Sequence, residues 1–572
     1  MNNKPQISFS RWKPIEIMLA VLFLIASFYY HPNIGGEGLR IPNNITVWMM
    51  ATIIIWYSLH LVLKRPTFII PKYFIYIAAF PILITLSGFV TGVEQPLKWL
   101  FRLLFIWGGL AFFFSLFQHG LKQGRLDRIL FVIVISALLQ GLAGIAQIWL
   151  QADMPFWLPK SPSGVPSGLF QQINNQASYQ VTAIMIVTYL ITRPLLTHGS
   201  KWQQGVLMLT VACATFLIGI SGSRIGALTL ILGLFIIIPA LWQRFKRNKK
   251  LASALLLALV IGGTLGVTIG SGRMIDKTVA MQSGYSGSSR LGIYTISLDL
   301  IKLQPVFGHG IGSFGRVFQY ARPDFYQAHP DAVLPEQYVS HPHNEIFFWL
   351  VEGGTIAGIG LLALLVSVIV ALRQIGWHRG GAYLAILLPI SLHTQVELPF
   401  NGSAIHWFMF IFILTVITTS NPIIKKQDLT ISARRSSSLV LALLMLLGFV
   451  FFAHTLRSQY DFTEFYQKLN LDKPAFPYAL QNPYLGEEAR WLQMSEFLFL
   501  SMDAELQNNV KQYTLWGEER LLEKPTVELY EKLVDAYQFL GNKVAYCATA
   551  EHGLASYPQA ERLKLAKDLC QY

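Results

Sequence analysis

Long apolar runs recur along this chain from Ile15 to about Leu456, and they constrain its fold more than any other feature. A helix needs about 20 apolar residues to cross a bilayer, and irregular backbone is not tolerated against lipid. The chain is 53% hydrophobic and 13% charged, whereas a soluble domain carries about 25% charged residues. We therefore predict an all-α polytopic membrane protein with about 13 transmembrane helices. They are expected near residues 15–30, 45–63, 73–91, 99–118, 129–150, 175–192, 203–220, 225–243, 251–270, 346–372, 380–393, 405–420 and 439–456.

Lysine and arginine gather in alternate connections between these spans, for example at 64–72 and 244–250. Cytoplasmic connections of membrane proteins carry such an excess, so the net charge of +14 indicates orientation and not a nucleic-acid partner. The N-terminus is then cytoplasmic, and chemistry on the opposite face takes place away from ATP. Any group transferred there must arrive already activated. The segments expected on that face are 151–174, 221–224, 271–345, 394–404 and the C-terminal tail.

The first apolar run follows Lys4, Arg11 and Lys13, which is also the layout of a cleaved signal peptide. No clear small-residue cleavage site follows Tyr30, so we interpret this run as the first span. The opposite end of the membrane region is marked by an abrupt change of composition. We predict a transmembrane domain at 1–456, with a large loop at about 271–345, and a soluble α-helical domain at 457–572.

The C-terminal tail is polar and has apolar residues at helical spacing over 484–512, 515–540 and 542–571. Packing of helix hairpins as in tetratricopeptide repeats is compatible with this pattern, although no clean repeat of roughly 34 residues is visible. Cys547 and Cys570 would lie in an oxidising compartment, where they can form a disulfide. Two unpaired small residues are the alternative.

The segment Ser340–Glu345 closes the long loop and leads directly into an apolar run. It contains His341, His343, Asn344 and Glu345, and histidine is the side chain best suited to take a proton near neutral pH. A zinc site would need further ligands at helical spacing, and none is obvious, so neither a metal nor another cofactor is indicated. A pair of interfacial histidines is the alternative.

Two arginines follow segments rich in serine and glycine on the same expected face. Arg224 follows Ser221–Ser223, and Arg290 follows Ser286–Ser289 at the start of an amphipathic stretch that reaches about Leu303. A guanidinium group offers a planar fork of donors to phosphate oxygens, and a helix N-terminus also attracts anions. Anchoring of a side chain at the membrane edge is the alternative for Arg224.

Further polar groups face the same side. Four amides lie at the entry to one span: Gln171, Gln172, Asn175 and Gln176. Amides so close to hydrocarbon need partners, which are either a sugar or neighbouring helices. Glu397, at the mouth of a short span, also needs a partner such as an arginine. The Gly-rich turn at 305–314 lacks the strand and the lysine of a nucleotide-binding loop, so we expect it to form a tight loop beneath the arginines.

The order of these motifs over residues 15–456 resembles the O-antigen ligase (WaaL) and Wzy-like superfamily. The amide motif is followed by Ser-x-Ser-Arg, an arginine and a Gly-rich turn in the long loop, His-Asn-Glu and Glu-x-Pro. The closest match is to the protein O-oligosaccharyltransferases of the PglL type, including the pilin-glycosylating TfpO type. This chain has Gln-Ile-Asn-Asn where that family has Gln-Pro-Asn, and Glu397-Leu398-Pro399 where it has Glu-Tyr-Pro.

The resemblance implies an enzyme of the bacterial inner membrane that transfers a glycan en bloc at the periplasmic face. The donor would be an oligosaccharide on undecaprenyl diphosphate, and the acceptor a serine or threonine of a pilin-like protein, with membrane lipids as further partners. His343 matches the catalytic histidine, and Arg224 and Arg290 match the arginines that bind the diphosphate. The remaining candidates would contact glycan or acceptor: Gln171, Gln172, Asn175, Gln176, His341, Asn344, Glu345 and Glu397.

This assignment agrees with the chemistry, because arginines stabilise a diphosphate leaving group and a base activates a hydroxyl without a metal. Within the superfamily, the alternatives are a ligase that acts on lipid A core and a Wzy-type polymerase. A transporter of lipid-linked glycan would instead carry charges near the midplane of several spans. A membrane scaffold that presents the tail would leave the arginines and histidines unexplained.

Overall fold

The computed structural model describes residues 12–121, 123–197, 199–270, 287–419, 422–467 and 475–570. Within these ranges, nine helices are long and apolar enough to cross a membrane. The only strands among the described residues form one short ribbon, so the prediction of an all-α polytopic membrane protein is confirmed. The nine helices are α2 (Pro42–Lys64), α3 (Phe74–Thr91), α4 (Pro96–Phe117), α5 (Gln123–Leu150), α8 (Lys201–Ser221), α9 (Arg224–Arg247), α10 (Lys249–Ile269), α15 (Glu345–Ile375) and α19 (Ile431–Gln467).

The other four expected spans are also helical, but they are shorter or more polar. The helix α6 begins with polar residues, and the other three have fewer than 18 residues each. Helices therefore occupy all the expected positions, although only nine of them meet the length and composition of a simple span. The four are α1 (Pro14–Leu24), α6 (Ile173–Leu190), α16 (Trp377–His393) and α18 (Ala404–Thr418).

The chain divides into two compact units. Unit 1 comprises residues 1–79, 105–278 and 362–463, and unit 2 comprises residues 80–104, 279–361 and 464–572. The division falls inside α3, α4, α15 and α19. The change of composition at residue 456 likewise falls inside α19, which continues to Gln467 without a break.

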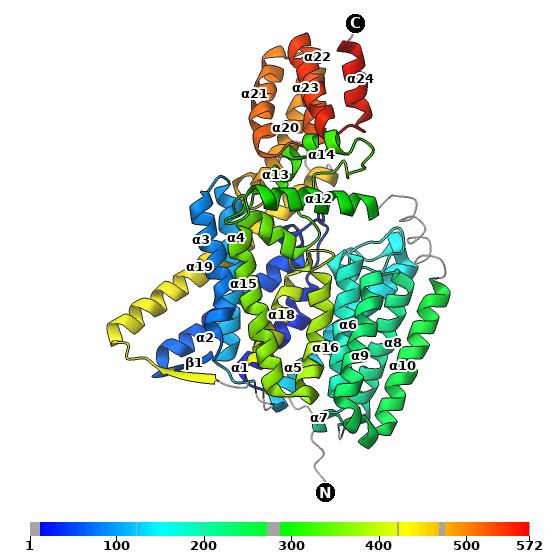
Figure 1. The fold of residues 1–572 in the computed structure, drawn as a ribbon, viewed down its shortest axis with the longest axis vertical. Coiled ribbons are helices and arrows are strands. Elements are labelled where there is room, and N and C mark those ends of the chain that lie inside the picture. The colour runs from blue at the N-terminus through cyan, green and yellow to red at the C-terminus, as the bar shows by residue number, and fades with distance from the viewer. Residues whose placement is uncertain are drawn as a thin grey trace. The chain divides into compact units, whose positions relative to one another are not determined.

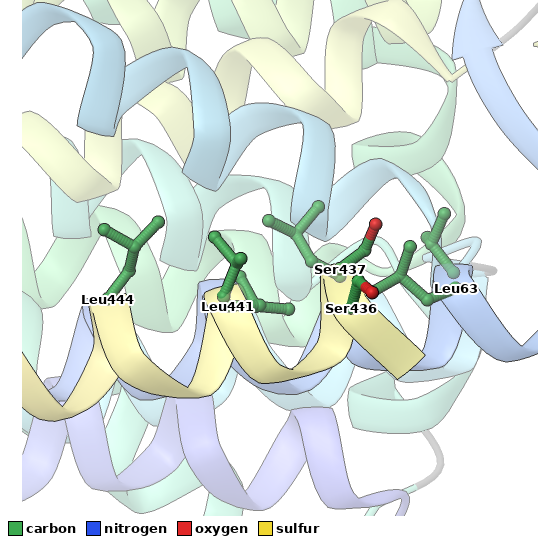
Figure 2. Close-up of a pocket in the computed structure, with 8 residues that line it drawn as sticks. Leu63, Ser436, Ser437, Leu441 and Leu444 are labelled. Atoms are coloured by element: carbon green, nitrogen blue, oxygen red, sulfur yellow. The ribbon is translucent and has the colours of Figure 1, made fainter. Parts of the chain in front are cut away.

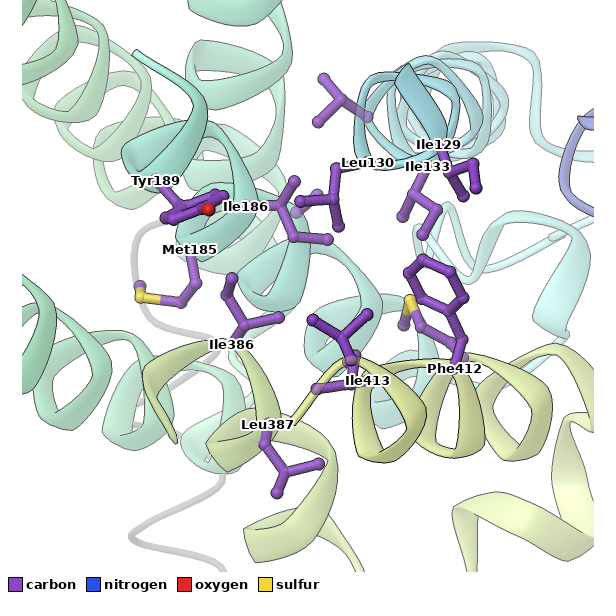
Figure 3. Packing of buried hydrophobic residues seen from close by; sticks show 14 of the residues in the cluster. Ile129, Leu130, Ile133, Met185, Ile186, Tyr189, Ile386, Leu387, Phe412 and Ile413 are labelled. Carbon is purple, nitrogen blue, oxygen red and sulfur yellow. The ribbon is translucent and has the colours of Figure 1, made fainter. Parts of the chain in front are cut away.

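The centre of unit 1 is α6, whose side chains are buried from Asn175 to Leu190. Helices α5 and α16 pack against it, and α18 adds side chains to the same apolar cluster, as Figure 3 shows for Ile133, Ile186, Ile386 and Ile413. A helix that is buried all round does not need the apolar stripe of a surface helix. It can therefore keep polar residues wherever neighbouring helices satisfy their hydrogen bonds.

Helices α8, α9 and α10 continue unit 1 on the far side of α6 (Figure 1). Two glycines allow α10 to approach α8 closely, because a Cβ atom at Gly262 or Gly266 would lie 2.2 Å from a carbonyl oxygen of α8. Elsewhere in unit 1, β1 (Thr67–Pro71) pairs antiparallel with β2 (Pro422–Lys426). This ribbon joins the end of α2 to the start of α19.

Unit 2 contains the described part of the long loop and the C-terminal helices. The loop forms α12 (Gly287–Leu303), α13 (Phe314–Tyr320) and α14 (Arg322–Ala328). Helix α12 ends at the residue where the amphipathic pattern ends. Ser286 and the preceding part of the loop, 271–285, lie outside the described residues.

The C-terminal helices pack consecutively against one another in unit 2 (Figure 1). The expected single helices at 484–512, 515–540 and 542–571 are wrong, because each is interrupted by a break. In the second of them, Lys524 leaves the helical region. Glu505 has a left-handed φ of 56° between the first two helices, and Tyr557 leaves the helical region before the last one. Cys547 and Cys570 are joined in a disulfide between the last two helices. The five helices are α20 (Gly486–Asp503), α21 (Gln507–Glu523), α22 (Val527–Phe539), α23 (Lys543–Ser556) and α24 (Glu561–Cys570).

A buried arginine joins these helices to the loop. Arg322, at the start of α14, is 1% exposed. Its Nε donates to the Ser556 carbonyl at 2.7 Å, and its Nη1 donates to the Pro335 carbonyl at 2.9 Å. The guanidinium also lies 4.3 Å from the ring centroid of Tyr557. A buried charge is tolerated only with such partners, so this contact fixes α14 against α23.

Candidate functional site

His343 lies in a tight turn just before α15. Its backbone has a left-handed φ of 54°, a conformation that costs a non-glycine residue free energy and that clusters at functional sites. Its N–H donates to Nδ1 of His341 at 3.2 Å, and the two rings meet edge to face with centroids 4.5 Å apart. Because Nδ1 of His341 accepts this bond, a neutral His341 carries its proton on Nε2. His341 is buried, at 8% exposure, and His343 is only partly buried.

The next two residues begin the helix. The Oδ1 atom of Asn344 accepts a hydrogen bond from the Phe347 N–H at 3.0 Å, which is an N-cap interaction. Glu345 lies in the first turn, where a negative charge is favourable, and its Oε2 accepts from the Trp349 indole at 2.9 Å. Both side chains therefore help to define the first turn of α15, directly beside the proposed base.

Arg290 belongs to the same part of unit 2. It lies in the first turn of α12, four residues before Tyr294 and hence on the same helical face. The Tyr294 ring meets the Phe347 ring edge to face, with centroids 5.2 Å apart. Since Phe347 is in the first turn of α15, this contact joins α12 to the helix that follows His343.

The Gly-rich turn at 305–312 packs against a break in α15. Gly354 has a φ of 62° and interrupts the helix, and a Cβ atom there would lie 2.2 Å from the Val306 carbonyl oxygen. The turn provides hydrogen bonds where the helix cannot: His309 N–H donates to Val351 O at 2.8 Å, and Gly310 N–H donates to Glu352 O at 3.0 Å. Beyond forming a tight loop, this turn supports the helix that follows His343.

A buried carboxylate lies at this break. Glu352 is 1% exposed, and its Oε1 accepts weakly from the Phe314 N–H at 3.4 Å. Its other oxygen has no hydrogen-bond partner among the described residues. Arg102 of α4 supplies positive charge to Glu352, and its guanidinium lies 4.4 Å above the Phe348 ring. The sequence interpretation missed this pair, although a glutamate inside an apolar run is a visible signal.

Arg224 is the first residue of α9 in unit 1 and is exposed. The residue before it, Ser223, caps the helix by accepting from the Gly226 N–H at 3.2 Å. The same hydroxyl donates to Oδ1 of Asn174 at 2.9 Å, which is at the start of α6. Arg224 and the amide segment therefore lie at one end of the unit 1 bundle, as their order in the sequence suggested.

Two of the four amides form hydrogen bonds within the helices themselves. Gln172 caps α6 by accepting from the Asn175 N–H at 2.5 Å, and the Gln176 Nε2 donates to the Gln140 carbonyl of α5 at 3.0 Å. The Asn175 side chain is buried. Gln171 differs, because it has a left-handed φ of 55° and its Nε2 has no hydrogen-bond partner among the described residues. Of the four amides, Gln171 is the one that has a buried donor without a partner among the described residues.

A histidine pair, which sequence interpretation did not identify as such, lies next to this amide segment. The Ser178 Oγ is 2.9 Å from Nδ1 of His393 and 3.2 Å from Nε2 of His406. His406 also places Nε2 3.1 Å from the Asn175 carbonyl oxygen and Nδ1 2.8 Å from the Ser403 Oγ. Glu397 lies one turn beyond His393 and contributes negative charge to that ring. All these side chains except Glu397 are buried, so they fix the beginning of α6 from within.

Two family models match this chain. Residues 209–362, which include Arg224, Arg290 and His343, match the model described as O-antigen ligase. Residues 382–568 match the model described as the C-terminal part of a virulence factor membrane-bound polymerase. No curated protein matches the chain. The two matches, together with the helical membrane fold, support a place in the O-antigen ligase and Wzy-like superfamily and a general activity in membrane glycan transfer.

Proposed function

We propose that this protein transfers a glycan from undecaprenyl diphosphate to a serine or threonine of an acceptor protein at the periplasmic face of the inner membrane. The observation that carries the proposal is the arrangement at the start of α15. His343 lies just before it in a strained, partly buried turn, and the Tyr294–Phe347 contact joins α12, whose first turn contains Arg290, to the first turn of α15. A base and a phosphate ligand are the two groups that such a transfer requires.

The reaction needs one proton transfer and one displacement. The acceptor oxygen attacks the anomeric carbon and gives its proton to His343, while the bond from that carbon to the diphosphate oxygen breaks. The electron pair leaves with the lipid diphosphate, whose negative charge Arg290 and Arg224 stabilise. A single displacement inverts the anomeric carbon. Because arginine stays charged at any physiological pH, the leaving group needs no metal for this stabilisation.

The C-terminal helices support a protein acceptor. They belong to the same compact unit as His343 and Arg290, and Arg322 fixes them to the loop helices. Repeated helix pairs are a common scaffold for binding extended protein surfaces. A tail held in this way can present an acceptor segment to the turn that contains His343.

A saccharide acceptor is the second candidate, and the two matching family descriptions favour it. A ligase and a polymerase would use the same donor, base and arginines, and only the acceptor hydroxyl would differ. The two candidate functions therefore involve the same chemistry at the diphosphate and differ only in the product that is formed.

The test is a comparison of cells that produce the wild-type protein, no protein, or the His343→Ala variant. Intact-mass measurement of pilin and electrophoresis of lipopolysaccharide are made on the same cultures. We expect pilin to lose a glycan mass in the last two, with unchanged amounts of the membrane protein. Retained glycosylation in His343→Ala would overturn the role of the base, and unchanged pilin with truncated lipopolysaccharide would favour the ligase. His329→Ala, an exposed histidine of the same loop, is the matched control.

A further inference from the structure

An apolar groove lies between α2 and α19 in unit 1. It has a volume of about 420 Å³, and Figure 2 shows Ser437, Leu441 and Leu444 following one another along α19, with Leu63 of α2 nearby. The α19 residues recur every three or four positions, so they form one helical face. The full lining consists of Leu59, Val62, Leu63, Ser436, Ser437, Val440, Leu441 and Leu444.

The position of α19 indicates what fills this groove. Only 6% of its most apolar stretch is buried, although that stretch is long and apolar enough to span a membrane. Leu443 and Leu447 are more than half exposed. A span with so little protein around it faces hydrocarbon, so a groove along it is filled by an acyl chain and not by water.

One end of the groove is closed by a polar connection. The Gln427 Nε2 atom donates to the carbonyl groups of Val62 and Arg65, each at 2.6 Å, and β1 pairs with β2 beside it. These contacts tie the start of α19 to the end of α2. They hold the two helices at a set separation there and keep the groove from closing.

Cations surround this closed end, while one carboxylate, Asp428, lies in the same connection. The Arg434 Nε atom is buried and has no hydrogen-bond partner among the described residues. Arg434 lies two and three residues before the serines that begin the groove on α19. Such a cluster attracts an anionic headgroup. The cations are Lys64, Arg65, Lys425, Lys426, Arg434 and Arg435.

The groove lies at the opposite end of α2 from the amide segment of unit 1. Asn43 and Asn44, in the first turn of α2, donate to the carbonyl groups of Leu169 and Gly402 beside the amide segment. Leu59 is 15 residues further along the helix, which corresponds to about 23 Å. An occupant whose phosphate lies at Arg434 is therefore a different molecule from the glycan donor.

We propose that the groove between α2 and α19 binds an anionic glycerophospholipid. One acyl chain lies against Leu59, Leu441 and Leu444, and the phosphate is bound at the cationic end by Arg434. This lipid completes the packing of α19, which has few protein neighbours of its own. The site takes its selectivity from the headgroup, because an acyl chain alone would not distinguish one phospholipid from another.

The experiment uses the full-length protein purified in detergent and mixed with dioleoyl phosphatidylglycerol or dioleoyl phosphatidylcholine. Native mass spectrometry counts bound lipid, and thermal unfolding measures its effect. We expect one phosphatidylglycerol to remain bound at collision energies that remove phosphatidylcholine, and a rise of several degrees in the unfolding temperature only with the anionic lipid. Equal retention of the two lipids by the wild-type protein would overturn the proposal.

Two variants locate the site. Leu441→Trp fills the groove, and Arg434→Gln removes the charge, so each should abolish the preference for phosphatidylglycerol. Leu447→Trp, on the exposed face of α19, and Arg247→Gln, at the end of α9, should preserve it. Full preference in Leu441→Trp and Arg434→Gln, or its loss in both controls, would show that the lipid binds elsewhere.

Discussion

The amide end of α6 in unit 1 and the His343 turn in unit 2 are both polar segments at the start of an apolar helix, but they use their polar groups differently. At α6, Gln172 caps the helix, Gln176 bonds the Gln140 carbonyl, and His406 faces the Asn175 backbone carbonyl. At the His343 turn, Asn344 and Glu345 define the helix start, while the imidazole remains partly exposed on a strained backbone. A cluster of polar residues in a sequence therefore identifies a region, whereas the contacts show what each member does in the fold.

The largest expected effect tests whether both regions serve one reaction. Arg224→Lys and Arg290→Lys should each lower transfer by about 10- to 100-fold, because lysine keeps the charge but loses the planar fork that binds phosphate. The measurement is the initial rate of glycan transfer from purified lipid-linked donor. Arg247→Lys, at the other end of α9, is the matched control. A normal rate in Arg224→Lys would remove the α9 end from the site.

The second prediction concerns the support beneath His343. Gly354→Ala should lower the free energy of unfolding by about 2 kcal/mol, since a Cβ atom would meet the Val306 carbonyl at 2.2 Å on a backbone with φ of 62°. Gly376→Ala is the control, because its φ is 85° but nothing lies within 4 Å of the added atom. Denaturant unfolding of the two variants in detergent measures the difference. Equal stability of the two variants would contradict the close packing of the Gly-rich turn against α15.

The third prediction separates two amides of the same segment. Gln176→Leu should lower the free energy of unfolding by about 1–2 kcal/mol, because it removes the bond to the Gln140 carbonyl, and leave transfer per folded molecule unchanged. Gln171→Ala should change stability by less than about 0.5 kcal/mol and lower transfer several-fold. Unfolding and transfer rates of both variants, measured in parallel, distinguish a structural amide from one that contacts the glycan. The reverse pattern would mean that the buried amide contacts the glycan.

The smallest effect concerns the tail. Burial alone would raise the pKa of Glu487, but Lys98, Arg520 and Lys524 outweigh it and lower the pKa from 4.5 to about 2. The ionised carboxylate therefore stabilises unit 2 above about pH 4.5, and this contribution is lost as the pH falls toward about 2. The unfolding temperature of Glu487→Gln should fall less steeply than that of the wild-type protein over this range. Identical slopes would show that the three cations do not act on Glu487.

Much of the helical framework follows from local pattern, because apolar length and charge asymmetry are properties of the chain itself. The end of α12 and the beginning of α15 were predictable in the same way. The break at Gly354 was not, because it depends on the backbone of the Gly-rich turn, nearly 50 residues earlier in the sequence. The turns near Glu505 and Tyr557 likewise depend on how consecutive helices fold back on one another.

The candidate site also combines features that follow from local pattern with features that depend on packing between distant segments. The choice of His343, Arg224 and Arg290 rests on motif order, which is a local property, and it stays a prediction. The hydrogen-bond partners of Gln172 and Gln176 were not predictable, because a sugar and a neighbouring helix satisfy an amide equally well. Arg102 and Glu352 were overlooked because one charge lies on each of two helices far apart in the sequence, and only packing makes them a pair.

The two ring nitrogens of His406 have different hydrogen-bond partners at the beginning of α6. Its Nε2 faces the Asn175 carbonyl, which has no proton to give, so Nε2 carries the proton. A neutral ring must then accept at Nδ1, and the Ser403 hydroxyl must point toward it. Ser403→Thr keeps a hydroxyl that donates to Nδ1, whereas Ser403→Ala removes this donor, so that it no longer fixes the orientation of the ring. Ser403, the residue immediately before α18, therefore sets the orientation of the imidazole and with it the hydrogen bond from Nε2 to the Asn175 carbonyl.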